Sequence, residues 1–209
     1  MTGIEASWSA LGWEWQECVR QAVASFAARG LPVGAVITSP SGMIAAGRNR
    51  VYDQRGGTEV LQRTPLAHAE MNALAAVSPD EELGRCALWS THSPCSMCRA
   101  AAEFLEIGAV RHLAADPSEP GSPHAADVDP VWAVAVNVLF LHNVAWVGSP
   151  DSPMVQRNRE QDPETTALAL HLVDRRTLID QVRSRRPTTD PVALLTPVWA
   201  EVVAAAAGR

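Results

Sequence analysis

Four side chains in two short segments have the types and spacing needed for a metal centre with an acid–base group beside it. His68 and Glu70 stand two residues apart, and Cys95 and Cys98, which follow Pro94, stand three apart. One histidine and two cysteines can bind zinc, and three protein ligands leave the fourth tetrahedral position open, as in catalytic zinc sites. A nearby carboxylate can move the protons of a water molecule in that position. We therefore interpret His68, Cys95 and Cys98 as zinc ligands and Glu70 as the acid–base group.

A cysteine pair with this spacing also occurs in redox-active dithiols and in structural zinc sites. A structural zinc site would need a second pair of cysteine or histidine ligands, and the sequence holds no second C-x-x-C. A redox pair would need no H-x-E upstream. The presence of both halves, in this order, favours the catalytic interpretation over the two alternatives.

Helix entries would bring these side chains together. Cys95 and Cys98 share one face of a first helical turn, and Pro94 suits the entry to that helix. His68 and Glu70 would diverge in the middle of a helix, so they converge only if His68 stands at the entry. Two helix N-termini would then meet at one metal, where they favour the thiolate form of the cysteines.

The pattern H-x-E followed by P-C-x-x-C is the signature of zinc deaminases. On these residues the chain resembles the cytidine deaminase-like superfamily. The resemblance is strongest to guanine deaminases, fungal-type cytosine deaminases and tRNA adenosine deaminases. It spans about residues 13–115 and is faint beyond them. The stretches that carry it are Pro32–Ile37, Gly47–Asn49, Ala67–Met71 and Ser93–Cys98.

The resemblance implies a Zn²⁺-dependent hydrolase that removes an exocyclic amine from a free nucleobase or nucleoside and releases ammonia. It also implies that Asn49 contacts the substrate and that Ala69 offers it a backbone N–H group at a helix start. His92 and Ser93 immediately precede Pro94 and are candidates for lining the pocket. The alternative for Asn49 is a turn cap, and the alternative for His92 is a polar loop residue.

Two other functions stay open. A tRNA adenosine deaminase would share the chemistry, although such enzymes usually carry Leu-Glu where this chain has His92-Ser93. A non-catalytic, zinc-stabilised interaction module would keep the ligands without needing Glu70. The net charge of −6 and the absence of lysine argue against a nucleic-acid partner. The modest arginine excess over residues 157–186 is interpreted as a solvated helix face.

Length and composition fit one globular domain over residues 1–209, with a core over about 13–150 and a C-terminal helical extension over about 164–207. Four cysteines, two of them assigned to zinc, imply no disulfide framework, and no signal-peptide pattern is present. We expect a cytoplasmic protein with a small-molecule substrate and no membrane contact. The resemblance implies a homodimer.

The expected fold is a three-layer α/β/α sandwich with a central five-stranded mixed sheet, because short strand and helix patterns alternate. Residues 134–140 could instead form a buried strand, and residues 1–10 are expected to be a loose arm. Loops are expected over 50–66, 115–130 and 148–163. The predicted strands are 33–38, 43–49, 86–91, 109–114 and 144–147. The predicted helices are 13–29, 68–77, 95–107, 131–141, 164–185 and 191–207.

Overall fold

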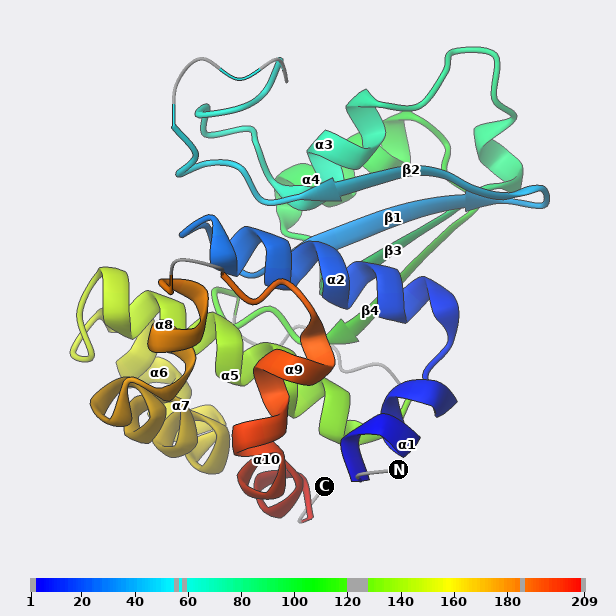
Figure 1. The fold of residues 1–209 in the computed structure, drawn as a ribbon. Helices are drawn as coiled ribbons and strands as arrows, with labels where there is room; N and C mark the ends of the chain where they lie inside the picture. The colour runs from blue at the N-terminus through cyan, green and yellow to red at the C-terminus, as the bar shows by residue number, and fades with distance from the viewer. Residues whose placement is uncertain (1–2, 55–56, 58–59, 120–127, 185–186, 208–209) are drawn as a thin grey trace.

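A mixed β-sheet forms the centre of the molecule in the computed structural model, which describes residues 3–54, 57, 60–119, 128–184 and 187–207. The strand order is β2-β1-β3-β4, and β1 runs antiparallel to both of its neighbours whereas β3 and β4 are parallel (Figure 1). The strands are β1 (Gly34–Ser39), β2 (Gly42–Arg48), β3 (Ala87–His92) and β4 (Ala109–Ala114).

The prediction of a fifth strand is wrong within the described residues, which form a four-stranded sheet. Residues 144–147 belong to α5 (Pro130–Val147), as do residues 134–140, where a strand was the alternative. The side chain of Asp129 accepts a hydrogen bond from the Val131 N–H and caps this helix. Most of α5 is buried on every side, so its sequence shows no amphipathic period that would separate a helix from a strand.

Helices cover both faces of the sheet, and the alternation of side chains along β1 separates the two cores. Val36 packs with α2 (Trp13–Ala27) and α5, whereas Ala35 and Ile37 pack with α3 (Ala69–Ala75) and α4 (Ser96–Phe104). The helices α3 and α4 therefore form one layer, and α2 and α5 form the other (Figure 1).

The N-terminal segment is a helix, α1 (Gly3–Ala10), and the prediction of a loose arm is wrong. Ile4 is only 1% exposed and packs into the core beside α5, which gives this short helix its tertiary support. A short 3-10 helix spans Leu83–Arg85. Where the structure describes them, the predicted loops over 50–66 and 115–129 contain no helix or strand, and Pro130 already belongs to α5. Residues 55–56, 58–59 and 120–127 of these loops lie outside the described residues.

The C-terminal region is more divided than predicted. The expected linker over 148–163 contains α6 (Pro153–Gln161), which Ser152 caps. The single helix predicted over 164–185 is two helices, because Arg176 adopts a left-handed conformation (φ 58°) between them. These are α7 (Pro163–Arg175) and α8 (Thr177–Val182). The terminal helix is likewise divided into α9 (Pro191–Leu195), a 3-10 turn (Thr196–Val198) and α10 (Trp199–Ala206).

Among the described helices, α5 is the one that is long and apolar enough to cross a membrane by length and composition alone. Its 18-residue span is 72% buried inside the protein. This burial is what a core helix requires, since α5 packs against α2, α7, α10 and β4.

Candidate active site

Two helix entries carry the predicted metal ligands. His68 is the residue before α3, and Cys95 is the residue before α4. Both have extended backbone conformations, and neither side chain caps its own helix. Their side chains are therefore available to a metal, and the prediction that two helix N-termini meet at one site is confirmed.

The three ligand atoms form an equilateral triangle. The distances from His68 Nδ1 to Cys95 Sγ, from His68 Nδ1 to Cys98 Sγ, and between the two sulfurs are each 3.6 Å. A tetrahedral zinc ion with bonds of about 2.0 Å to nitrogen and about 2.3 Å to sulfur separates its ligand atoms by about 3.5–3.8 Å. The side chains present fit zinc both in donor type and in spacing.

The thiol of Cys98 needs a positive charge nearby if it is to ionise. Burial, followed by the negative charges of Glu70 and Cys95, raises the pKa of this thiol well above its ordinary value. A bound divalent cation reverses this effect and deprotonates a thiol that coordinates it. Cys98 would therefore release its proton when a metal binds.

Glu70 lies beside the triangle, buried at 3% exposure on the first turn of α3. Its Oε1 accepts a hydrogen bond from Ser90 Oγ at 2.9 Å, and its Oε2 lies 3.6 Å from Cys98 Sγ. Burial raises the pKa of the Glu70 carboxyl, while its own backbone N–H and the Ser90 hydroxyl oppose the rise. A carboxyl group beside the candidate metal site, with its pKa raised in this way, is suited to exchanging protons with a bound substrate.

Sequence reasoning did not identify Ser90, which is fully buried on β3. Strand alternation places it on the same face as Leu88, which packs in the core beneath α3. A hydroxyl at a core-facing strand position, two residues before His92, is the sequence signal that could have indicated it.

Two further residues fix the entry of α3 against β2. A side chain at Gly47 would collide with the carbonyl oxygen of Ala69, so glycine is needed for the close approach of the helix. The Asn72 side-chain amide lies within hydrogen-bonding distance of three carbonyl oxygens, those of Arg48 (2.9 Å), Ala67 (3.1 Å) and His68 (3.0 Å). The end of β2 and the residue that carries the metal-binding imidazole are therefore tied together.

A pocket of about 110 Å³ opens onto His68, Cys95 and Glu70. Asn49, His92 and Ser93 line it, as the sequence predicted for substrate contacts. Ala69 does not line the pocket through its side chain, since it is fully buried at the first position of α3, and the role of its N–H group stays a prediction. Asn49 Oδ1 also accepts a hydrogen bond from the Val51 N–H at 3.2 Å, so the turn-capping alternative holds alongside the pocket position.

His92 is buried and neutral. Its Nδ1 lies 3.0 Å from Thr91 Oγ1, and its ring packs 5.1 Å from the Phe140 ring. Burial lowers the pKa of His92 to about 3, against an opposing effect of Asn137. Trp89, by contrast, is partly buried and packs 4.9 Å from the Trp15 ring on the other side of the sheet.

The outer wall of the pocket comes from the part of the chain after β4. Asp116 and Ser118 line it, together with Phe140 of α5 and Met154 of α6. Helix α6 holds the loop that carries Asp116 and Ser118. Asn158 donates a hydrogen bond to the Pro117 carbonyl oxygen at 2.8 Å, and Arg157 donates one to the Ser118 carbonyl oxygen at 3.1 Å.

Comparison with known proteins agrees with this geometry. Residues 13–113 match the family model of the cytidine and deoxycytidylate deaminase zinc-binding region. This segment contains the His68, Cys95 and Cys98 triangle together with Glu70. No curated protein sequence matches the chain.

Several solved structures are similar over part of the chain. One, from a study of A-to-I editing by tRNA:A34 deaminases at the wobble position of transfer RNA, is 26% identical, covers 56% of this chain and 95% of its own, and has a TM-score of 0.43. Guanine deaminase from Bacillus subtilis is 29% identical over 58% of this chain and 71% of its own, with a TM-score of 0.39. Guanine deaminase from Nitrosomonas europaea is 22% identical over 67% of this chain and 75% of its own, with a TM-score of 0.39. Because these TM-scores are low, the similarity to this family rests on residues 13–113 and their motif.

Proposed function

We propose that this chain, whose zinc-binding region places it in the cytidine deaminase-like superfamily, removes an exocyclic amine from a free nucleobase or nucleoside by hydrolysis. One observation carries the proposal: the 3.6 Å triangle of His68, Cys95 and Cys98 has the buried carboxyl group of Glu70 beside it. Three ligands and an adjacent acid–base group are what hydrolytic amine removal requires.

His68, Cys95 and Cys98 would hold the zinc ion, which supplies the Lewis acidity that makes water a nucleophile near neutral pH. Glu70 accepts a proton from the attacking water and delivers it to the ring nitrogen next to the amine-bearing carbon. It then takes a second proton from the hydroxyl group now bonded to that carbon and transfers it to the amine, and the carbon–nitrogen bond breaks to release ammonia while the carbonyl forms. Burial suits Glu70 to both steps, because it raises the pKa of the carboxyl towards the working pH.

The walls of the pocket support a small substrate. Asn49, His92 and Ser93 lie on one side, and the segment after β4 contributes Phe140 and Met154 on the other. A volume of about 110 Å³ suits a planar ring. The hydrogen bonds from Asn158 and Arg157 hold the loop between β4 and α5 at the pocket.

Ammonia release by the zinc-loaded protein from a panel of aminated bases and nucleosides tests the proposal. We expect turnover of at least one member. Inertness of a folded, zinc-loaded protein towards the whole panel would contradict it and favour the interaction module. Conversion of the wobble adenosine of a tRNA, without turnover of the panel, would instead identify a tRNA adenosine deaminase.

A further inference from the structure

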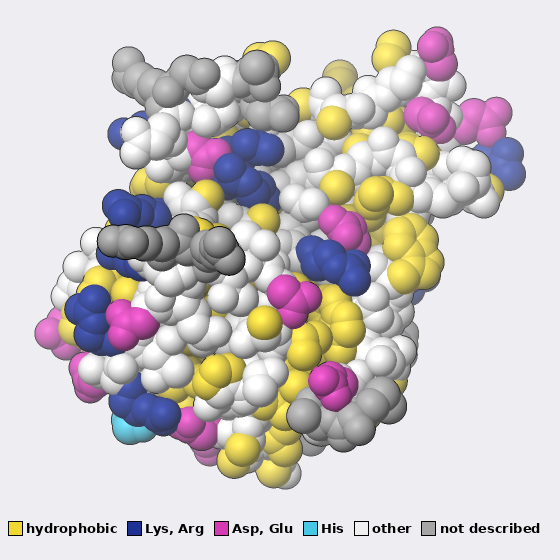
Figure 2. All heavy atoms as spheres, in the orientation of Figure 1, with side chains coloured by type: hydrophobic (Ala, Val, Ile, Leu, Met, Phe, Trp, Pro, Cys, Tyr) yellow, Lys and Arg dark blue, Asp and Glu magenta, His cyan; other side chains and the backbone are white. Residues whose placement is uncertain are grey.

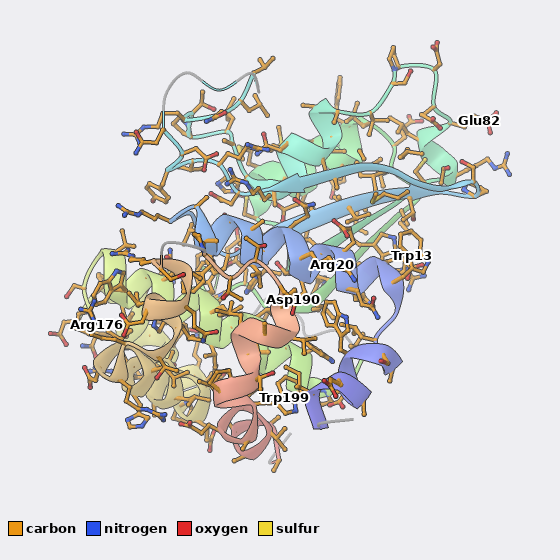
Figure 3. The ribbon with its side chains drawn as sticks, viewed as in Figure 1. Trp13, Arg20, Glu82, Arg176, Asp190 and Trp199 are labelled. Atoms are coloured by element: carbon orange, nitrogen blue, oxygen red, sulfur yellow. The ribbon has the colours of Figure 1, made fainter. Side chains whose placement is uncertain are left out.

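Arginine side chains converge on Trp146, near the C-terminal end of α5. The guanidinium carbon of Arg176 lies 5.1 Å from the centre of the indole ring, and that of Arg183 lies 5.2 Å from it. Arg29 stands close enough to influence the charge of Arg183. Figure 2 shows arginine side chains gathered at the left edge of the molecule, where Arg176 is labelled in Figure 3. We call these four residues the Trp146 cluster.

The three arginines come from separate parts of the chain. Arg29 follows the end of α2, Arg176 stands between α7 and α8, and Arg183 follows α8. Arg29 (φ 69°) and Arg176 (φ 58°) are both in the left-handed conformation, in which glycine is the usual residue at a helix end. The fold thus brings arginine side chains to one place from positions that would otherwise favour glycine.

Positive charge in the cluster is poorly balanced. Asp180 pairs with Arg176 at 3.6 Å, but neither Arg29 nor Arg183 forms an ion pair with any described residue. Partial burial, together with the positive charges of Arg29 and Arg176, lowers the pKa of Arg183. Like charges held together repel one another, and a bound anion would remove that repulsion.

A second arginine–tryptophan pair in the same protein shows the ordinary surface arrangement. Arg20 lies 5.2 Å from the centre of the Trp8 ring and pairs with Glu17 at 3.4 Å. That site holds one arginine and one carboxylate, so its charge is balanced. Arg111, 5.2 Å from the centre of the Trp89 ring, likewise forms no ion pair with a described residue, but it lies on that ring alone. Two arginines on one indole ring set the Trp146 cluster apart among the described residues.

We propose that Arg29, Arg176 and Arg183 form a binding site for a phosphate group, either as free phosphate or as a phosphate monoester. Guanidinium groups donate paired hydrogen bonds that match the geometry of phosphate oxygens. The Trp146 ring holds Arg176 and Arg183 in position through cation–π contacts, which lowers the entropy lost when the anion binds.

The cluster lies on the same elements as the catalytic pocket. Leu31 lines the pocket two residues after Arg29, and Phe140 lines it six residues before Trp146, about 9 Å along α5 at ~1.5 Å per residue. The Ser25 hydroxyl lies 2.6 Å from the Leu31 carbonyl oxygen and 2.8 Å from that of Asn49, which ties this end of α2 to the pocket. A phosphate in the cluster would therefore lie on the same elements that build the pocket.

Calorimetric titration with inorganic phosphate and with ribose 5-phosphate tests the site directly. We expect the Arg29→Gln/Arg183→Gln double variant to bind both at least tenfold more weakly than the wild type, and the matched control Arg20→Gln to bind them unchanged. All the exchanged side chains are exposed, so thermal unfolding should be unaffected. No phosphate binding by the wild type, undiminished binding by the double variant, or an equal loss in Arg20→Gln would overturn the proposal.

A kinetic comparison then identifies the source of the phosphate, and this step rests on the proposed deaminase function. The wild type and the double variant are each assayed with a nucleoside and with its 5′-phosphate, and the KM of the nucleoside is divided by the KM of the phosphate. If this ratio falls to one in the double variant, the phosphate belongs to the substrate. An unchanged ratio, with phosphate binding intact in the wild type, assigns it to a separate ligand. The calorimetric result stands even if no substrate is turned over. Binding of tRNA that depends on the cluster, without binding of either small phosphate, would contradict the proposal.

Discussion

Ser90 and Glu70 are joined by a buried hydrogen bond of 2.9 Å, in which the serine hydroxyl donates to Oε1 of the carboxylate. The bond connects β3 to α3 across the interface that also positions Cys98, whose sulfur lies 3.6 Å from the other carboxylate oxygen. Ser90 therefore fixes the orientation of the group that must move protons, and it also favours its charged form.

Replacing Ser90 with alanine should lower kcat about tenfold or more while zinc content stays the same. A hydrogen bond to a charged group contributes ~1.5–3 kcal/mol, and each ~1.4 kcal/mol lost from the transition state is a tenfold change in rate. Thr166→Val is a control, since it removes another fully buried hydroxyl, on α7. Equal loss of kcat in both variants would show that Ser90 acts only through stability.

Asn49→Asp separates substrate binding from turn capping. The aspartate keeps an oxygen that can accept from the Val51 N–H, which lies 3.2 Å from Asn49 Oδ1, but it loses the amide donors of a side chain that lines the pocket. We expect KM to rise about tenfold, the cost of one lost hydrogen bond, with thermal stability unchanged. If kcat/KM is unaffected in Asn49→Asp, the side chain serves the turn alone.

Cys95→Ala should abolish zinc binding and activity, and should also lower the unfolding temperature in the presence of zinc. The wild type should carry about one zinc per chain. Cys86→Ala is the control, because it removes another thiol, which is buried at 2% exposure and lies outside the ligand triangle. Metal analysis of the two variants tests the assignment, and full zinc occupancy in Cys95→Ala would refute it.

The sequence predicted that His68, Cys95 and Cys98 come together, because the geometry of a helix entry is local. A histidine and a cysteine placed just before α3 and α4 determine where the two ligands lie, whatever packs around them. The spacing of Cys95 and Cys98 within one helical turn fixes the third ligand in the same way.

The rest of the fold depends on tertiary packing, which a local sequence pattern does not predict. Helix α5 is apolar on every side, so its sequence could not exclude a strand at residues 144–147. These residues are helical, and the prediction of a fifth strand there is wrong. The pocket wall formed by Phe140 and Met154 depends on how α5 and α6 return to the sheet. The cytoplasmic location and the homodimer stay predictions.

His142 should make the fold sensitive to acid. It is fully buried on α5, and burial lowers its pKa to about 4 from an ordinary value of about 6.5. The folded state therefore keeps His142 neutral while the unfolded state binds a proton between these two values. Its contribution to stability is complete above about pH 6.5 and is lost as the pH falls towards about 4.

Thermal unfolding at pH 7 and pH 5 measures this effect. His142→Leu should lose less stability than the wild type between the two pH values. Some loss should persist, because burial also lowers the pKa of His92, to about 3. An identical fall in the unfolding temperature of both proteins would show that His142 does not contribute to the acid sensitivity.

The most direct test of the account measures zinc content and ammonia release in the same preparation of Glu70→Gln. Glu70 is assigned to proton transfer and not to the metal, since its carboxylate lies beside the ligand triangle. The variant should keep its zinc and its fold while turnover of the best wild-type substrate falls by at least ~10²-fold, the usual effect of removing a general acid–base group. Loss of the zinc, or turnover close to that of the wild type, would contradict the role assigned to Glu70.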